Sequence, residues 1–177
     1  IMASTTWNLD TAHSEVTFKV KHLVISTVSG NFKNFSSAVS TEGDDFSTAK
    51  ISFELETGSL DTGSDMRNDH LRGDDFFNAE AFPKILFTAT AIRPVNGAEH
   101  EVDGQLTIRD VTKPITFKVE FGGIAKDPYG QVKAGFEVEG KIKRSEFGLS
   151  WNALTEAGGA VVSDEVKIQA NVQYIKQ

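Results

Sequence analysis

Residues 14–22 read SEVTFKVKH, and this stretch shows the pattern that decides the fold. Val16, Phe18 and Val20 alternate with polar or charged residues at every second position. Successive side chains of a β-strand point to opposite faces, so the alternation predicts a strand with one buried face. The same period recurs at 51–56, 102–108, 115–121, 132–142 and 166–174, and less regularly near 28–40 and 85–95. The sequence therefore predicts about eight strands, most with one polar face, as antiparallel sheets have.

Short connections join several of these strands. Asn96-Gly97 tolerates the positive φ angles of a type I′ hairpin turn. Residues 127–130, DPYG, fit a type I turn, and residues 145–160 look like a long loop. Many strands joined by short turns indicate a closed barrel or a sandwich, and closure also removes exposed sheet edges. No repeat or linker interrupts the chain, so residues 1–177 are predicted to form one domain.

The composition is that of a globular protein with an unusually apolar interior. Hydrophobic residues make up 39% of the chain, and there are thirteen Phe but only two Trp and two Tyr. Phe has no polar group, so this excess predicts an interior that needs few hydrogen-bond partners. The formal net charge of −7 argues against nucleic acid as a partner. The absence of Cys excludes disulfides and thiolate chemistry.

The sequence gives no indication of stable membrane insertion. No stretch approaches the roughly 20 apolar residues of a membrane-spanning helix. The first residues, IMASTTWNLD, have neither the basic nor the apolar region of a signal peptide. On this basis a cytoplasmic location is expected, with a periplasmic or secreted location as the alternative if an export signal has been removed.

Residues 65–83, DMRNDHLRGDDFFNAEAFP, interrupt the strand pattern with a dense polar cluster. Residues 64–72 suit a short helix, with Thr62 or Ser64 as the N-cap and Gly73 as a left-handed stop. Residues 74–82 suit a further helical turn before Pro83. The segment is therefore predicted to form a short, polar, helical cover over one end of the barrel.

This polar cluster contains atoms that bind metals, but their arrangement favours a structural role. Asp69 and His70 are adjacent, and adjacent residues on a helix point about 100° apart. The sequence contains no HExxH, calcium-loop or GxSxG motif, so neither a metal site nor a catalytic residue is predicted. Arg67 and His70 share one helix face, and Arg72 lies close by, so the three form one basic cluster. Two interpretations of this face remain open: it holds an anionic head group, or it forms ion pairs with Asp65, Asp69 and Asp74.

The inward positions of the strands define a candidate ligand-binding interior. Its predicted lining residues are Phe18, Val20, Phe53, Phe117, Val119 and Phe136. His22 continues the inward face of its strand, either as a hydrogen-bonded strand end or as a ligand contact at the barrel mouth. An eight-stranded barrel can be packed solid or can hold one ligand, and alternation alone does not distinguish these two cases.

A series of short motifs, in this order, resembles the YceI-like family of lipocalin-like, polyisoprenoid-binding proteins. The similarity runs from Trp7 to about Tyr174. It is carried by WNLD at 7–10, His13-Ser14, FKVKHL at 18–23, GNF at 30–32, Arg67, HLR at 70–72, DFF at 75–77, Phe82-Pro83, GQLTI at 104–108, TKP at 112–114, Asp127-Pro128, Gly135-Phe136, FGL at 147–149 and Trp151-Asn152.

Two positions depart from the usual pattern of this family. The family commonly shows Arg-Asp-x-His in the helix, whereas this chain has Arg67-Asn68-Asp69-His70. The acid has therefore moved by one position. The aromatic residue after Asp-Pro is commonly Trp, and here it is Tyr129.

The resemblance implies a fold and a function. The expected fold is all-β: an eight-stranded antiparallel up-and-down β-barrel (lipocalin-like), with a short helical segment near 64–82. The expected function is non-catalytic binding or carriage of a long-chain isoprenoid or similar amphipathic lipid, such as a polyprenyl phosphate or a quinone-like molecule, in an elongated apolar cavity of the barrel. No cofactor is expected apart from such a bound lipid or quinone. The six apolar lining residues would bind the tail, and His22, Arg67 and His70 would face the head group.

Two alternative functions and the partners of the protein remain to be considered. One alternative is an enzyme that acts on a hydrophobic substrate through His70 and the neighbouring Asp residues. Another is an interaction module with a solid core. A small-molecule lipid is the expected partner, and a homodimer is allowed because antiparallel barrels of this kind often pair.

Overall fold

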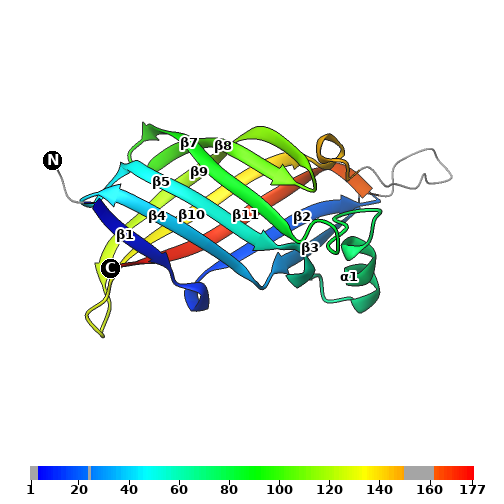
Figure 1. Cartoon of the computed structure of the whole chain (residues 1–177), viewed down its shortest axis with the longest axis horizontal. Helices are drawn as coiled ribbons and strands as arrows, with labels where there is room; N and C mark the ends of the chain where they lie inside the picture. Colours follow the sequence, from blue (N-terminus) through cyan, green and yellow to red (C-terminus); the bar gives the residue numbers. More distant parts are fainter. Residues whose placement is uncertain (1–3, 24, 150–161) are drawn as a thin grey trace.

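The computed structural model describes residues 4–23, 25–149 and 162–177. These residues wind into an antiparallel β-barrel with one short helix at an end (Figure 1). The helix is α1 (Asp65–Arg72). The strands are β1 (Ser4–Leu9), β2 (Glu15–His22), β3 (Ser26–Phe32), β4 (Phe35–Glu42), β5 (Asp45–Glu56), β6 (Leu60–Asp61), β7 (Lys84–Asn96), β8 (Glu99–Ile108), β9 (Val111–Lys126), β10 (Val132–Lys143) and β11 (Val162–Lys176).

The barrel consists of eight strands once two interrupted strands are counted as single ones. β1 and β2 follow one another along β11, because β11 pairs with β2 over its first half and with β1 at its end. β3 and β4 follow one another in the same way, β3 beside β2 and β4 beside β1. β4, β5 and β7 to β11 pair one after another, the two-residue strand β6 lies beside β3, and the pairing of β11 with β1 and β2 closes the barrel. The predicted eight-stranded antiparallel barrel is confirmed.

The break between β1 and β2 is a single 3-10 turn, Thr11–His13, organised by Asp10. The Asp10 carboxylate lies 2.8 Å from His13 Nδ1 and 2.8 Å from Lys133 Nζ of β10. The hydrogen bond from Lys133 is the largest of the interactions that hold the pKa of Asp10 below its ordinary value of 3.8. This cluster ties the break in the wall to the neighbouring part of the barrel.

Several local expectations need correction. The hairpin between β7 and β8 forms, but its loop residues are Gly97 and Ala98, and only Gly97 has a positive φ (54°). A type I′ turn requires two positive φ angles, so that turn type was wrong. Gly73 is extended (φ −79°, ψ 177°) rather than left-handed. Residues 73–82 continue after α1 as hydrogen-bonded turns rather than helix. The predicted loop at 145–160 begins with a 3-10 turn at Arg144–Phe147, and residues 150–160 lie outside the described residues.

Helix α1 lies against one end of the barrel, and the start of β1 and the C-terminus lie toward the other (Figure 1). Ser64 is its N-cap, because its Oγ accepts a hydrogen bond from the backbone N–H of Arg67. Arg72 fixes the last turn of α1: its guanidinium donates to the carbonyl oxygens of Gly58 and Leu60 at 3.0 and 3.1 Å. The end of the helix is therefore attached to the segment that lies between β5 and α1.

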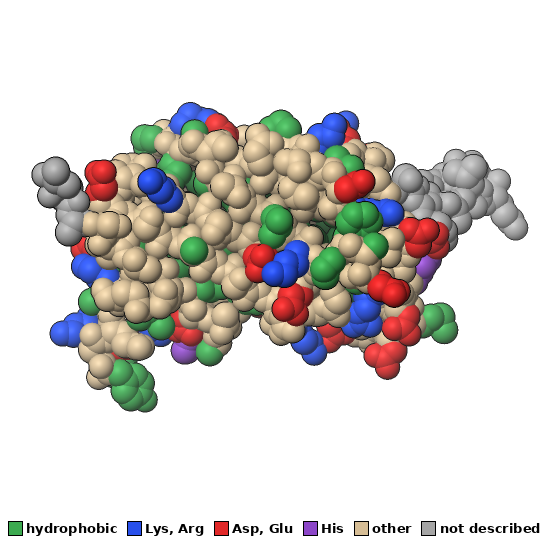
Figure 2. Space-filling view, in the orientation of Figure 1, with side chains coloured by type: hydrophobic (Ala, Val, Ile, Leu, Met, Phe, Trp, Pro, Cys, Tyr) green, Lys and Arg blue, Asp and Glu red, His purple; other side chains and the backbone are tan. Residues whose placement is uncertain are grey.

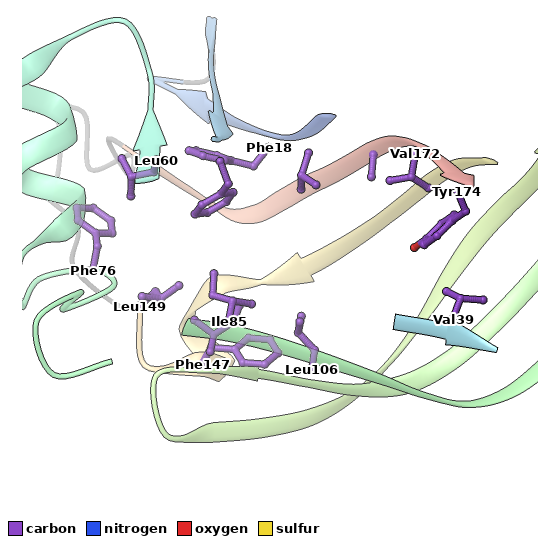
Figure 3. Packing of buried hydrophobic residues seen from close by; sticks show 14 of the residues in the cluster. Phe18, Val39, Leu60, Phe76, Ile85, Leu106, Phe147, Leu149, Val172 and Tyr174 are labelled. Carbon is purple, nitrogen blue, oxygen red and sulfur yellow. The ribbon is translucent and has the colours of Figure 1, made fainter. Parts of the chain in front are cut away.

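Buried apolar side chains point inward from the strands, as Figure 3 shows for residues from both ends of the barrel. Phe76 and Leu60 lie at the α1 end, and Val39 and Tyr174 lie at the other. Trp7 is completely buried, and its indole N–H donates to Thr41 Oγ1 at 2.9 Å. The barrel interior, rather than a second packed layer, is thus where the apolar surface is buried.

Candidate functional site

The candidate site is a cavity of about 890 Å³ inside the barrel. It is lined by side chains from nearly every strand and from α1. All six predicted tail-binding residues line it: Phe18, Val20, Phe53, Phe117, Val119 and Phe136. So do the three residues predicted for the head group: His22, Arg67 and His70. The interior is therefore hollow, which disagrees with the solid-core alternative. The ligand-binding role of these nine residues stays a prediction.

Two glycines explain how so many Phe rings leave space between them. A Cβ atom at Gly140 of β10 would lie 2.5 Å from the Phe117 ring, and one at Gly104 of β8 would lie 2.5 Å from the Phe87 ring. Both distances are too short for real atoms. Because these positions carry no side chain, each ring can pack directly against the backbone of a neighbouring strand, and Phe87 and Phe117 meet edge to face at 5.1 Å. The wall is thereby lined with aromatic rings that do not fill the centre.

The α1 end of the cavity is lined by Arg and His side chains rather than by carboxylates. Its charged or titratable lining residues, within the described ranges, are His22, Arg67, His70 and Arg144. The Asp side chains of this segment point elsewhere and do not line the cavity. In Figure 2 acidic side chains gather on the outer surface at this end of the molecule. The inner and outer faces of the mouth thus carry opposite charge.

The two open interpretations of the α1 cations apply to different residues. Arg72 makes the expected ion pair, with Asp69 Oδ1 at 3.3 Å. His70 Nε2 lies 2.9 Å from Oδ2 of Asp75, which follows the helix. Among the residues that the structure describes, none forms a hydrogen bond or ion pair with the Arg67 side chain. Arg67 is therefore the helix cation that best fits a ligand contact, whereas Arg72 has a structural role.

Arg144 is a lining residue that the sequence analysis missed. It is only 4% exposed, and its guanidinium donates to the carbonyl oxygens of Ser163, Leu149 and Val162 at 2.6–3.1 Å. Burial lowers the pKa of Arg144 below its ordinary value. Arg144, directly after β10, follows Val138 and Ile142, which are even-numbered positions of the strand that point into the barrel. A cation at such an inward position could have indicated this residue from the sequence. Arg144 ties the end of β10 to the start of β11 beside the mouth.

The structural role of Asn68 was also missed. The sequence showed only that this position, commonly Asp in the family, is Asn here. Asn68 is 5% exposed, and its Oδ1 accepts from both the backbone N–H and the hydroxyl of Thr62. Its Nδ2 donates to Asp61 Oδ1 at 3.0 Å, and this bond helps to lower the pKa of Asp61 to about 2, after the larger effect of the Gly63 backbone N–H. An Asp at position 68 would accept the same two bonds but would repel Asp61. The amide therefore suits this chain's own neighbour.

The opposite end of the cavity carries a buried phenol and two acidic residues. Tyr174 is 5% exposed, and its OH lies 2.8 Å from Ser37 Oγ. Ser37 Oγ donates to the Ser52 carbonyl at 2.7 Å, so the Tyr174 OH is the donor to Ser37. Burial raises the pKa of Tyr174 to about 12, which keeps it neutral near neutral pH. Asp44 and Asp45 line the cavity at the β4–β5 turn.

The described residues contain neither a group of side chains placed to bind a metal ion nor a membrane-spanning helix. Within them, no group of three or more His, Asp or Glu side chains is placed to hold a metal ion. None of their helices is both long and apolar enough to cross a bilayer.

Comparison with known proteins identifies the family. The model of the YceI-like domain matches residues 7–174. A UPF0312 protein from Staphylococcus aureus (strain bovine RF122 / ET3-1) is 37% identical over 171 residues, which cover 96% of this chain and 97% of that protein. The chain belongs to the YceI-like family. The resemblance found in the sequence motifs is confirmed.

Solved structures of other proteins show the same barrel. The Campylobacter jejuni YceI protein matches with a TM-score of 0.76 and 35% identity, covering 95% of this chain and 96% of that one. Burkholderia cenocepacia BcnA matches with a TM-score of 0.81 and 27% identity, covering 93% and 98%. A polyisoprenoid binding domain from Saccharophagus degradans matches with a TM-score of 0.69, covering 97% and 98%. At 18% identity, this last similarity concerns the fold.

Proposed function

We propose that this YceI-like protein binds and carries a long-chain isoprenoid or similar amphipathic lipid without catalysing a reaction on it. The observation that carries the proposal is the apolar cavity of about 890 Å³ along the inside of the barrel. This volume is roughly six times that of a cavity of roughly 150 Å³ that takes up one benzene, so it would hold about 35 carbon atoms, or about seven isoprene units. The polyisoprenoid binding domain from S. degradans shares the same fold.

The energetics of such a cavity favour a long tail. Each methylene transferred from water to an apolar site contributes about 0.8 kcal/mol. Ten methylenes would therefore contribute about 8 kcal/mol before the costs of ordering the tail and the loss of its free motion are subtracted. An isoprenoid tail offers no hydrogen-bonding groups, which matches the Phe, Val and Ile side chains of the wall.

The charges at the two ends of the cavity support an orientation for the bound lipid. Arg67, His70 and His22 line the α1 end, whereas Asp44 and Asp45 line the opposite end. An anionic head group such as a phosphate is attracted to the first end and repelled from the second. We infer that the head group lies beside Arg67 and that the tail points toward Tyr174. A quinone-like head group would lie at the same end, where its carbonyl oxygens would accept hydrogen bonds from Arg67.

The experiment that tests this proposal has two readouts. Mass spectrometry of organic extracts of the purified protein should show co-purified isoprenoid, and the lipid-free protein should bind added prenyl phosphate. Arg67→Gln should weaken binding of the phosphate several-fold while leaving binding of the matching prenyl alcohol unchanged. Lys19→Gln is the matched control, because Lys19 lies on the outer face of β2 and does not line the cavity.

Two results would contradict the proposal. The first is extracts that repeatedly lack lipid, together with no binding of any added prenyl lipid. The second, which concerns the orientation alone, is an equal loss of phosphate and alcohol binding in Arg67→Gln. An enzyme that uses the His70–Asp75 pair, whose atoms lie 2.9 Å apart, would instead turn over prenyl or acyl substrates, and His70→Ala would abolish that turnover while lipid retention stayed the same.

A further inference from the structure

The end of the barrel opposite α1 is closed by a group of aromatic side chains, which we call the aromatic floor. It consists of Trp7, Phe46, Phe121, Phe136 and Tyr174. Phe46 stands at its centre, with ring centroids 4.8 Å from Trp7, 5.0 Å from Phe136 and 5.5 Å from Phe121. Phe136 and Phe121 stack at 5.1 Å, and Tyr174 meets Phe136 edge to face at 6.0 Å. Four of these rings line the cavity, so a tail that enters from α1 would end against them.

A bulge in β5 brings Phe46 into this position. Ser40 pairs with Lys50, but Glu42 pairs with Asp45, so the four residues 46–49 lie opposite the single residue Thr41. Bulges re-aim side chains in this way. The Asp45 carboxylate accepts hydrogen bonds from the backbone N–H and the hydroxyl of Ser47, at 3.0 and 2.6 Å. The bulge is thus fixed by its own side chains.

The turn beside the bulge is fixed as well. Thr48 Oγ1 accepts a hydrogen bond from the Glu42 N–H at 2.8 Å and donates to the Asp45 carbonyl at 2.5 Å. The Trp7 indole donates to Thr41 Oγ1, which in turn donates to the Gly43 carbonyl at 2.6 Å. With its neighbours held on both sides, Phe46 has a defined place at the end of the cavity.

Little protein separates the cavity from solvent behind Phe46. The same cavity is lined by Asp44, Asp45 and Ser47 of this turn, and all three are exposed. We propose that the Phe46 ring is the end wall of the lipid cavity and sets the greatest tail length that the protein accepts. The inference rests on the proposed function, and it names the substrate class more closely: isoprenoid lipids whose tails fit between the α1 mouth and the aromatic floor.

The chemistry of the floor explains why it would stop a tail. Beyond Phe46 the cavity lining changes from aromatic rings to two carboxylates and a hydroxyl. A tail that passes Phe46 leaves the apolar wall and returns to water, so additional isoprene units gain no further burial. Tails longer than the limit must also fold back or displace the ring, which costs binding free energy because the bulge is held in place.

The test measures affinity for a series of prenyl alcohols that differ by one isoprene unit, for the wild type and three variants of the full chain. For the wild type, affinity should rise with tail length up to a limit and then fall. Phe46→Ala should move this limit to longer tails by at least one isoprene unit. For the first alcohol beyond the wild-type limit, the affinity relative to that of the optimal alcohol should be about tenfold higher in the variant than in the wild type. Phe46→Trp should move the limit to shorter tails.

Phe53→Ala is the matched control. Phe53 also lines the cavity, but it stacks on Phe35 in the side wall at 6.0 Å. Its loss should widen the cavity and change affinities without moving the length limit. If Phe46→Ala does not fold, as judged by thermal unfolding, Phe46→Leu replaces it alongside Phe46→Trp.

The outcomes separate this inference from the proposed function. If the wild type binds prenyl alcohols with a length limit that none of the Phe46 variants moves, the inference is overturned and the proposed function stands. The inference is also overturned if Phe53→Ala moves the limit as Phe46→Ala does. If the wild type binds neither prenyl alcohol nor prenyl phosphate of any length and its extracts lack lipid, the proposed function fails, and this inference fails with it.

Discussion

Gly140 shows how a single residue keeps the barrel hollow. Its missing side chain leaves room for the Phe117 ring to lie against β10 instead of in the centre of the cavity. Sequence alternation correctly placed Phe117 on the inward face, because side-chain direction in a strand follows directly from its two-residue period. Whether the ring fills or lines the interior depends on a residue of the neighbouring strand, and one strand's pattern does not contain that information.

Gly140→Ala should therefore reduce both stability and lipid binding. The new Cβ would lie 2.5 Å from the Phe117 ring, so the ring must turn into the cavity. Overpacking of this kind costs about 1–3 kcal/mol in the free energy of unfolding, measured by denaturant titration, and prenyl lipid affinity should fall as well. Gly135→Ala on the same strand is the control, because a Cβ there meets no atom within 4 Å. Equal behaviour of the two variants would contradict this view of the wall.

At the scale of the element, the regular strands were predictable and their interruptions were not. The alternating segments of the sequence all lie in strands of the barrel. The break at Thr11–His13 depends on Asp10, whose partner Lys133 is distant in sequence, so a local pattern does not reveal it. The β5 bulge at 46–49 instead depends on short-range bonds among Asp45, Ser47 and Thr48, which the two-residue alternation does not describe. Arg144 was missed because Val162 and Ser163, two of its carbonyl partners, belong to another strand, and Asn68 was missed because its bonds depend on how the chain turns before α1.

The joint between β1 and β2 gives a prediction at this scale. A double-mutant cycle with Asp10→Asn and Lys133→Met should show clear coupling in the free energy of unfolding, because the two groups are 12% and 17% exposed and 2.8 Å apart. The Lys141–Glu165 pair on β10 and β11 is the control. Its groups are 63% and 59% exposed and 3.5 Å apart, so its coupling should be close to zero.

The coupling should also depend on pH in a defined direction. The pKa of Asp10 is lowered from 3.8, so the contribution of the pair is complete above this value and is lost as the pH falls through the lower, folded-state pKa. The pKa of Lys133 is raised from 10.5, so the contribution is lost again as the pH rises through the higher, folded-state pKa. A coupling that stays constant as the pH is lowered well below 3.8 would contradict the assignment.

At the scale of the whole molecule, the barrel combines a hollow apolar interior with opposite polarity at its two ends. Arg67 and its neighbours line one end, and Asp44 and Asp45 line the other. The sequence motifs were enough to predict the family, the barrel and the residues of the lining. The resemblance also implied a cavity, whereas the strand alternation alone did not, because the volume of a cavity depends on how all the inward side chains pack together. A homodimer stays a prediction.

The most direct test of the central claim is the heat capacity change on binding. Prenyl phosphates of increasing tail length should be titrated into the protein by calorimetry at several temperatures, each below its micelle concentration. Burial of apolar surface lowers the heat capacity by about 0.45 cal/(mol·K) per Å². We predict a negative heat capacity change whose magnitude increases with each added isoprene unit until the cavity is full. A heat capacity change that is near zero, or that does not depend on tail length, would contradict a tail buried inside the barrel.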